Sequence, residues 1–203
     1  MQCVKATRLT NRSSRRRFVA RFWALRYASP KTAPLSARLN SGVRSRMNKI
    51  VVREVRSDDF SQWLQLWTGY NAFYGRSGTT ALPHEITNTT WQRIFDPAEP
   101  VHALVAETNG KIVGLAHYLF HRSTIQIQPT CYLQDLFTEP QARGLGIGQK
   151  LIFSVYDLAK SAGSPRVYWQ THETNATAMR LYDKIAERSG FIVYRKILDS
   201  SET

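Results

Sequence analysis

The sequence has 203 residues, of which 42% are apolar and 21% charged, so it suits one packed domain with an extension and excludes a low-complexity chain. Its two cysteines are too few for a disulfide framework, and no apolar stretch approaches the roughly 20 residues that cross a bilayer. These features predict a cytoplasmic protein with no membrane contact.

The net charge of +13 is concentrated at the start of the chain. Residues 1–46 hold twelve Lys or Arg and no Asp or Glu, whereas residues 47–203 hold sixteen basic and fifteen acidic residues. We expect the first segment to be disordered. It can be an upstream extension, an organelle transit peptide, or a basic arm that binds polyanions. A nucleic-acid partner is expected only through such an arm, because the remaining chain is nearly neutral.

Regular patterns begin directly after Met47. Residues 50–55 have the composition of a strand. Apolar residues at spacings of three and four then predict an amphipathic helix over residues 60–74, and a second, shorter helix is expected over residues 85–95. Aromatic side chains on the first of these helices can either line a cleft or belong to the core: Trp67, Tyr70, Phe73 and Tyr74.

Three strands are expected next. Val101–Thr108 and Lys111–His121 are rich in β-formers and are separated by Asn109-Gly110, a strong signal for a tight hairpin. Thr130–Thr138 is apolar almost throughout, which predicts a strand that is covered on both faces.

The rest of the chain alternates helix and strand. The pattern predicts a helix over residues 147–160, a strand over residues 166–171, a helix over residues 175–188 and a last strand over residues 191–198. Together with the earlier elements, this order predicts an α/β fold with a mixed central sheet flanked by about four helices.

A glycine-rich loop connects the third of these strands to the following helix. Glycine allows unusual backbone dihedrals and close approach of a ligand, and the free amides at a helix N-terminus favour an anion. The Gly-Lys-Ser/Thr ending of a P-loop is missing, because Gln149-Lys150 follows. The expected guest is a pyrophosphate, held by Arg143, Gly144, Leu145, Gly146, Ile147 and Gly148.

The loop is similar to the Q/R-x-x-G-x-G/A signature of the GNAT superfamily of N-acetyltransferases. Residues 174–184 resemble its second signature, an Asn, an Ala and then a Leu-Tyr pair, and Ser189-Gly190-Phe191 resembles its turn from helix to strand. The resemblance covers about residues 50–198. It is strongest to small yeast-type histone and D-amino-acid acetyltransferases, followed by polyamine acetyltransferases.

The resemblance implies a GNAT-like acyl-CoA N-acyltransferase fold over residues 47–203, with acetyl-CoA as co-substrate and no metal. Backbone groups of Leu136, Phe137 and Thr138 would hold the pantetheine arm, and the amides of the loop would hold the pyrophosphate. Asn175 would contact the cofactor or cap the last helix.

The resemblance also suggests catalytic residues. Tyr182 matches the tyrosine that protonates the leaving thiolate, although the same position suits a core residue. Polyamine acetyltransferases often carry a Glu before the Asp matched to Asp135, and here that site is Gln134, which cannot accept a proton. Asp135 and Glu173 are therefore the candidate bases, and Asp135 can instead be structural.

The expected activity is transfer of an acetyl group to a primary amine by direct attack, with the amine either small or part of a peptide. Polyamines, amino acids, aminoglycoside-like amines and protein lysines all remain open as acceptors. The alternative is a non-catalytic GNAT-like module that binds acyl-CoA. Family analogy implies a homodimer.

Overall fold

The computed structural model describes residues 49–198, and the basic segment expected at residues 1–46 lies outside them. A five-stranded sheet with the order β1-β2-β3-β4-β5 forms its centre. The strands span Val51–Glu54 (β1), Val101–Thr108 (β2), Lys111–His121 (β3), Thr130–Thr138 (β4) and Val167–Tyr168 (β5). Strands β1 to β4 are antiparallel neighbours, whereas β4 and β5 are parallel, which confirms the mixed sheet.

The predicted hairpin joins β2 and β3. Asn109 has a φ of 51° and Gly110 a φ of 76°. A two-residue turn with positive φ at both positions follows the right-handed twist of the flanking strands, and Asn and Gly adopt it at low cost. The turn fixes the register of β3 against β2, and in the next pair of strands His117 of β3 lies opposite Asp135 of β4.

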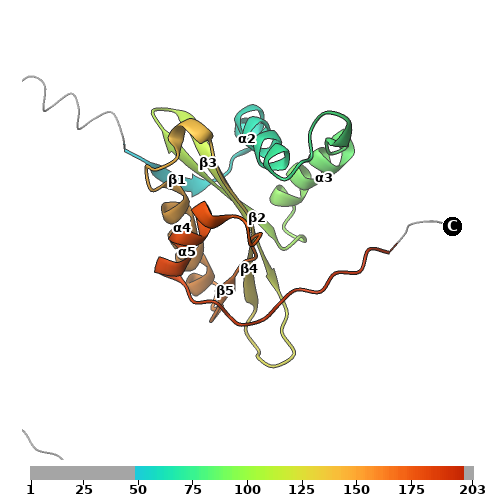
Figure 1. Cartoon of the computed structure of the whole chain (residues 1–203), viewed down its shortest axis with the longest axis vertical. Coiled ribbons are helices and arrows are strands. Elements are labelled where there is room, and N and C mark those ends of the chain that lie inside the picture. The colour runs from blue at the N-terminus through green and yellow to red at the C-terminus, as the bar shows by residue number, and fades with distance from the viewer. Residues whose placement is uncertain (1–48, 199–203) are drawn as a thin grey trace, which may run out of the picture. The chain divides into compact units, whose positions relative to one another are not determined.

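Helices cover both faces of the sheet (Figure 1). One face carries α2 (Phe60–Phe73) and α3 (His84–Phe95), and the other carries α4 (Ile147–Ser161) and α5 (Ala176–Ile185). This arrangement confirms the expected layers. Within residues 49–198, no helix combines the length and apolar character required to cross a membrane.

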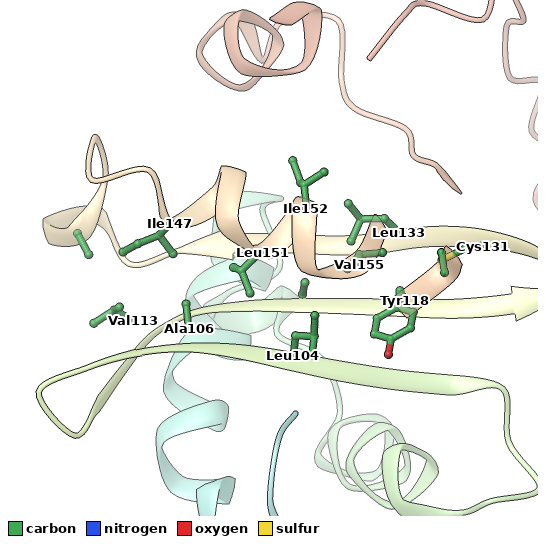
Figure 2. Packing of buried hydrophobic residues seen from close by; sticks show 13 residues of the cluster. Leu104, Ala106, Val113, Tyr118, Cys131, Leu133, Ile147, Leu151, Ile152 and Val155 are labelled. Carbon is green, nitrogen blue, oxygen red and sulfur yellow. The ribbon is translucent and has the colours of Figure 1, made fainter. Parts of the chain in front are cut away.

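The core on the α4 side is mostly aliphatic, with Tyr118 and Cys131 among its members, as Figure 2 shows. Ile147, Leu151 and Val155 recur at spacings of four on α4, and each is at most 2% exposed. Burial of one such side chain contributes about 1.5–3 kcal/mol. Gly114 of β3 allows the helix to approach, because a Cβ there would lie 2.7 Å from the Ile147 side chain.

The core on the α2 side is aromatic. Trp63, Trp67 and Tyr70 are 0%, 7% and 8% exposed and stack in sequence along α2, with ring centroids 5.8 and 5.4 Å apart. Trp67 is therefore a core residue. Phe73 and Tyr74, at the end of the helix, keep about half of their surface exposed, at 54% and 41%.

The prediction of a last strand over residues 191–198 was wrong. After Ile185 the chain has no regular structure, and it runs outward as an extended segment (Figure 1). The helix before it also ends earlier than predicted, and β5 has two residues rather than the six expected. A strand requires a neighbour for its backbone groups, and the described chain provides none for residues 191–198.

Candidate active site

The predicted phosphate loop lies between β4 and α4. Gly144 and Gly146 have φ values of 80° and 77°, in the left-handed region that glycine tolerates. A Cβ at either position would meet no atom within 4 Å, so the backbone conformation alone requires glycine. Gly146 directly precedes α4, whose first amides are unpaired within the helix and favour an anion.

Arg143 stands at the start of this loop with an exposed side chain. Its Nε donates to the carbonyl oxygen of Thr138 at 3.3 Å, and its guanidinium carbon lies 5.9 Å from the centroid of the Phe137 ring. These contacts hold the cation beside the loop while other donors of its fork remain available for phosphate oxygens. A cleft of about 350 Å³ opens beside it, lined also by Gly69 and Phe73.

The outer edge of β4 is paired over a short length only. In β5, Val167 and Tyr168 lie opposite Cys131 and Tyr132, and no further β4 residue has a strand partner on that side among residues 49–198. Residues 136–138 therefore present an open strand edge next to the loop. Such an edge can bind an extended ligand through its backbone groups.

A β-bulge at Gln134 changes the face to which β4 side chains point. Tyr118 of β3 pairs with Leu133 and His117 pairs with Asp135, so Gln134 has no opposite residue. Before the bulge, Leu133 packs in the aliphatic core on the α4 side; after it, Phe137 packs on the α2 side. The bulge thus brings the Asp135 carboxylate to the face occupied by the aromatic residues of α2.

Asp135 belongs to a buried polar chain. The Trp63 indole Nε1 donates to Nε2 of His117 at 2.9 Å, and Nδ1 of His117 lies 3.0 Å from Oδ2 of Asp135. The three residues are 0%, 3% and 6% exposed. Asp135 was predicted from the sequence, whereas the other two were missed. The signal that could have found His117 is an imidazole in the middle of an otherwise apolar strand.

Two tyrosines of the α2 region adjoin this carboxylate. Burial, together with the charge of Asp135 and hydrogen bonding to it, raises the pKa of Tyr70. Burial and the same charge raise the pKa of Tyr74. Both phenols therefore stay neutral near pH 7, and Tyr70 can donate a hydrogen bond to Asp135. The positive charge of Arg76 lowers the pKa of both tyrosines. Its guanidinium carbon lies 6.0 Å from the ring centroid of Tyr70 and 5.6 Å from that of Tyr74.

A profile of the Acetyltransferase (GNAT) family matches residues 62–186, which include the loop, the bulged strand and the last helix. The D-amino-acid N-acetyltransferase of Saccharomyces cerevisiae is 35% identical over 151 residues, covering 73% of this chain and 91% of that protein. The chain belongs to the GNAT family of acetyltransferases. It is an N-acetyltransferase, as the resemblance implied.

Two further comparisons agree with membership of this family. The thialysine N-ε-acetyltransferase of Bos taurus is 27% identical over 141 residues, covering 66% of this chain and 81% of that protein. A solved aminoglycoside N-acetyltransferase in complex with CoA has a TM-score of 0.63 at 15% identity, covering 73% of this chain and 95% of that chain. At that identity, the second likeness shows the GNAT fold alone.

Tyr182 of the acetyltransferase lies on α5 and packs against the aliphatic core. Its ring centroid is 5.3 Å from that of Trp169. Burial, with a smaller contribution from Tyr74, raises the pKa of Tyr182 to about 12. The hydroxyl therefore carries its proton throughout the neutral range. The packing role weighed for Tyr182 is thus present, and proton donation by its hydroxyl stays a prediction.

Asn175 caps α5 of the acetyltransferase. Its side-chain oxygen accepts from the amide of Ala178 at 3.4 Å, and its Nδ2 donates to Oγ1 of Thr171 at 3.1 Å. The capping role expected for Asn175 is thus present. A contact with the cofactor stays a prediction.

The alternative base, Glu173, lies apart from the polar chain of the acetyltransferase. It is exposed on the turn before α5, and its neighbour His172 bonds Oγ1 of Thr174 at 2.8 Å. Asp135, in contrast, is buried and bonded to His117. Among residues 49–198, no three His, Cys, Asp or Glu side chains gather as metal ligands would.

Proposed function

We propose that this N-acetyltransferase takes its acetyl group from acetyl-CoA and binds the pyrophosphate at residues 143–148. The observation that carries the proposal is the pair of left-handed glycines at Gly144 and Gly146, ahead of a fifteen-residue helix. Glycines in this conformation can direct consecutive amides into one concavity, and the dipole of the following helix favours a negative charge there. Arg143 supplies the cation, and Asn175 adds a polar contact from the start of α5.

The pantetheine arm lies along the open edge of β4 in this proposal. The backbone of Leu136, Phe137 and Thr138 pairs with it as an added strand would. The thioester then lies near the bulge at Gln134, where the ladder between β3 and β4 is interrupted. A free backbone amide at this point would stabilise the oxyanion of the tetrahedral intermediate.

Proton transfer in the proposed reaction uses Asp135 and Tyr182. An alkylammonium must lose one proton to become a nucleophile, and Asp135 accepts it directly or through one water. The amine nitrogen then bonds to the acetyl carbon, and the C–S bond breaks. Tyr182 donates a proton to the departing thiolate and is replenished by the second proton lost from nitrogen. The net products are the amide, CoA and one proton.

The acceptor in this proposal is a small primary amine, with amino acids first among the candidates. The support is the activity for which the yeast relative is named, that of a D-amino-acid N-acetyltransferase, with 91% of its length matched. The half-exposed ring of Tyr74 and the carboxylate of Asp135 suit a cationic nitrogen, the ring by a cation–π contact. A peptidic lysine presents the same group and is the second acceptor to test.

The experiment is release of free CoA thiol from acetyl-CoA across a panel of D- and L-amino acids, thialysine, polyamines, aminoglycosides and a lysine peptide. We expect turnover with at least one amine, and the acetylated product at the mass expected for one acetyl group. Acetyl-CoA binding measured by calorimetry serves as the parallel readout. Tight binding without turnover of any amine would instead identify a non-catalytic acyl-CoA-binding module.

A homodimer is also proposed, and the C-terminal segment supports it. Six large apolar side chains of residues 191–198 are between 65% and 90% exposed: Phe191, Ile192, Val193, Tyr194, Ile197 and Leu198. An apolar surface of this extent marks an interaction site. A second copy that offers an open strand edge would pair with this segment and cover it.

The compartment is proposed to be the cytoplasm. The free thiol of Cys131, buried in β4, suits a reducing environment. Polyanion binding is assigned to residues 1–46 alone, because residues 47–203 carry nearly equal numbers of basic and acidic groups.

A further inference from the structure

The buried chain of Trp63, His117 and Asp135 connects helix α2 to the bulged strand through the middle of the sheet. The two contacts in it are short, at 2.9 and 3.0 Å, and the three side chains are at least nine-tenths buried. A histidine in contact with a carboxylate has two available arrangements: a neutral imidazole that donates to a carboxylate, or an imidazolium paired with it.

The indole decides between these arrangements. Indole Nε1 can only donate, so Nε2 of His117 must accept and carry no proton. The single ring proton then resides on Nδ1 and is donated to Oδ2 of Asp135. A second proton on His117 would place two N–H donors against each other in a dry environment, each without an acceptor, which is strongly unfavourable. Trp63 thereby keeps His117 neutral.

We propose that Trp63 and His117 are positioning residues for acetyl transfer, which make Asp135 rather than His117 the group that takes the proton from the amine. This inference rests on the proposed role of Asp135. Because His117 occupies Oδ2, the incoming proton is directed to Oδ1: one N–H bond of the ammonium breaks, one O–H bond forms, and the proton later leaves to solvent.

The other ionisable groups around Asp135 leave this assignment unchanged. The charge of Asp135 acts on Tyr70 and Tyr74 of the α2 region and on Tyr132 of its own strand, and Tyr70 also hydrogen-bonds to it. All three are phenols whose pKa is raised, first by burial. They remain neutral donors or acceptors. The positive charge of Arg76 lowers the pKa of Tyr70 and Tyr74, against the effect of burial. Within the described residues, His117 is therefore the neighbour that could compete for the proton at neutral pH, and Trp63 prevents it.

The same helix offers a matched control. Trp67 follows Trp63 by one turn, is also buried, and stacks on it with centroids 5.8 Å apart. Its Nε1, however, has no hydrogen-bond partner within the described residues. Trp63→Phe and Trp67→Phe remove the same volume from the same aromatic row, and only the first removes a hydrogen bond to His117.

The direct test is ¹⁵N NMR of the imidazole in the full-length enzyme between pH 5 and 9. In the unmodified enzyme we expect the ¹⁵N shifts of His117 to show one ring proton, on Nδ1, with Nε2 as the acceptor of the Trp63 indole. In Trp63→Phe, Nε2 has no donor opposite it, so we expect the fixed Nδ1–H tautomer to be lost and kcat/KM to fall more at acidic pH than at neutral pH. In Trp67→Phe neither should change. An imidazolium at pH 7 in the unmodified enzyme, or identical behaviour of the two Phe variants, would overturn the proposal.

Variants at His117 test the second bond. Both remove the ring that packs against Trp63 and Trp67 and the acceptor of the Trp63 indole, so the difference between them reports the donor to Asp135. The amide of His117→Asn can donate to Asp135 and cannot be protonated, so kcat should stay within a few-fold of the unmodified value. His117→Leu lacks the donor, and kcat should fall by about tenfold or more. Equal losses in the two variants would contradict a positioning role. Asp135→Asn separates the two proposals: retained turnover would refute Asp135 as the base, whatever the NMR shows for His117.

Discussion

Tyr182 combines a packing role with the proton donation that we propose for it. Its ring contacts Trp169 and the aliphatic core, and burial holds its proton by raising its pKa to about 12. A phenol with such a pKa loses its proton with difficulty. In the proposed mechanism, the thiolate in the bound state must therefore be the stronger base for the proton to be transferred. A restored proton is then held firmly for the next turnover.

Replacement of Tyr182 by Phe should lower kcat by roughly 100-fold, because the proton donor to the thiolate is lost. The ring contacts remain, so the melting temperature and the acetyl-CoA dissociation constant should change little. Steady-state kinetics, calorimetry and thermal unfolding measure the three quantities. Because the pKa of Tyr182 is about 12, deprotonation of Tyr182 should not reduce the activity of the unmodified enzyme between pH 7 and 9. An unchanged kcat in the variant would remove Tyr182 from the mechanism.

The candidate residues of this site differ in how far the sequence alone could suggest them. Gly144, Gly146 and Tyr182 sit in short motifs whose meaning is local, so they could be selected without a structure. The contact between His117 and Asp135 spans 18 residues, and that between His117 and Trp63 spans 54. Both depend on strand register and on a bulge, which no local pattern specifies.

Helix α4 links the core to the predicted phosphate loop. Its apolar stripe fixes the helix against the sheet, and its N-terminus begins directly after Gly146 in the left-handed conformation. The loop amides are therefore positioned by a rigid element, which limits the freedom lost when an anion binds. Affinity for CoA should thus depend on the loop backbone as well as on Arg143.

Replacement of Gly146 by Ala tests this dependence. The added Cβ meets no atom within 4 Å, so the expected cost of about 1 kcal/mol comes from the positive φ alone. If the backbone relaxes to avoid the positive φ, the loop amides turn away from the pyrophosphate. CoA should then bind about tenfold more weakly, a loss of about 1.4 kcal/mol. Calorimetric titration with CoA measures the change.

Gly163→Ala is the matched control for that variant. Gly163 lies just beyond the other end of α4, with a φ of 75°, and a Cβ added there would likewise meet no atom within 4 Å. Its replacement should lower the free energy of unfolding by a similar amount and leave CoA affinity unchanged. Equal affinity losses in the two variants would show that the effect comes from helix stability and not from the loop.

Elements formed within the predicted bounds where the interactions that define them are local in the sequence. The hairpin of β2 and β3 and the helices α2 and α4 formed where their turn residues and apolar periods predicted. The segment of residues 191–198 has an equally strong strand composition and yet forms no strand. Composition shows that a segment can form a strand, whereas strand formation also requires a free sheet edge next to the segment.

At the scale of the molecule, charge and apolar surface lie in different parts of the sequence. Nearly all of the net charge of +13 belongs to residues 1–46, so it says little about the acceptor amine. The largest run of exposed apolar side chains within the described residues is toward the other end of the chain, over residues 191–198. This apolar segment, and not the charge, indicates how the enzyme would associate with itself.

Light scattering coupled to size exclusion should give a mass about twice the 23.2 kDa of one chain. The double variant Ile192→Asp/Tyr194→Asp should convert the dimer to a monomer, because two charges would have to be buried against the partner. The control is Ile125→Asp/Ile127→Asp, which changes two side chains that are each 89% exposed on the loop between β3 and β4. That variant should remain dimeric. A monomeric unmodified enzyme would refute the homodimer, and a dimer that survives the tail variant would place the interface elsewhere.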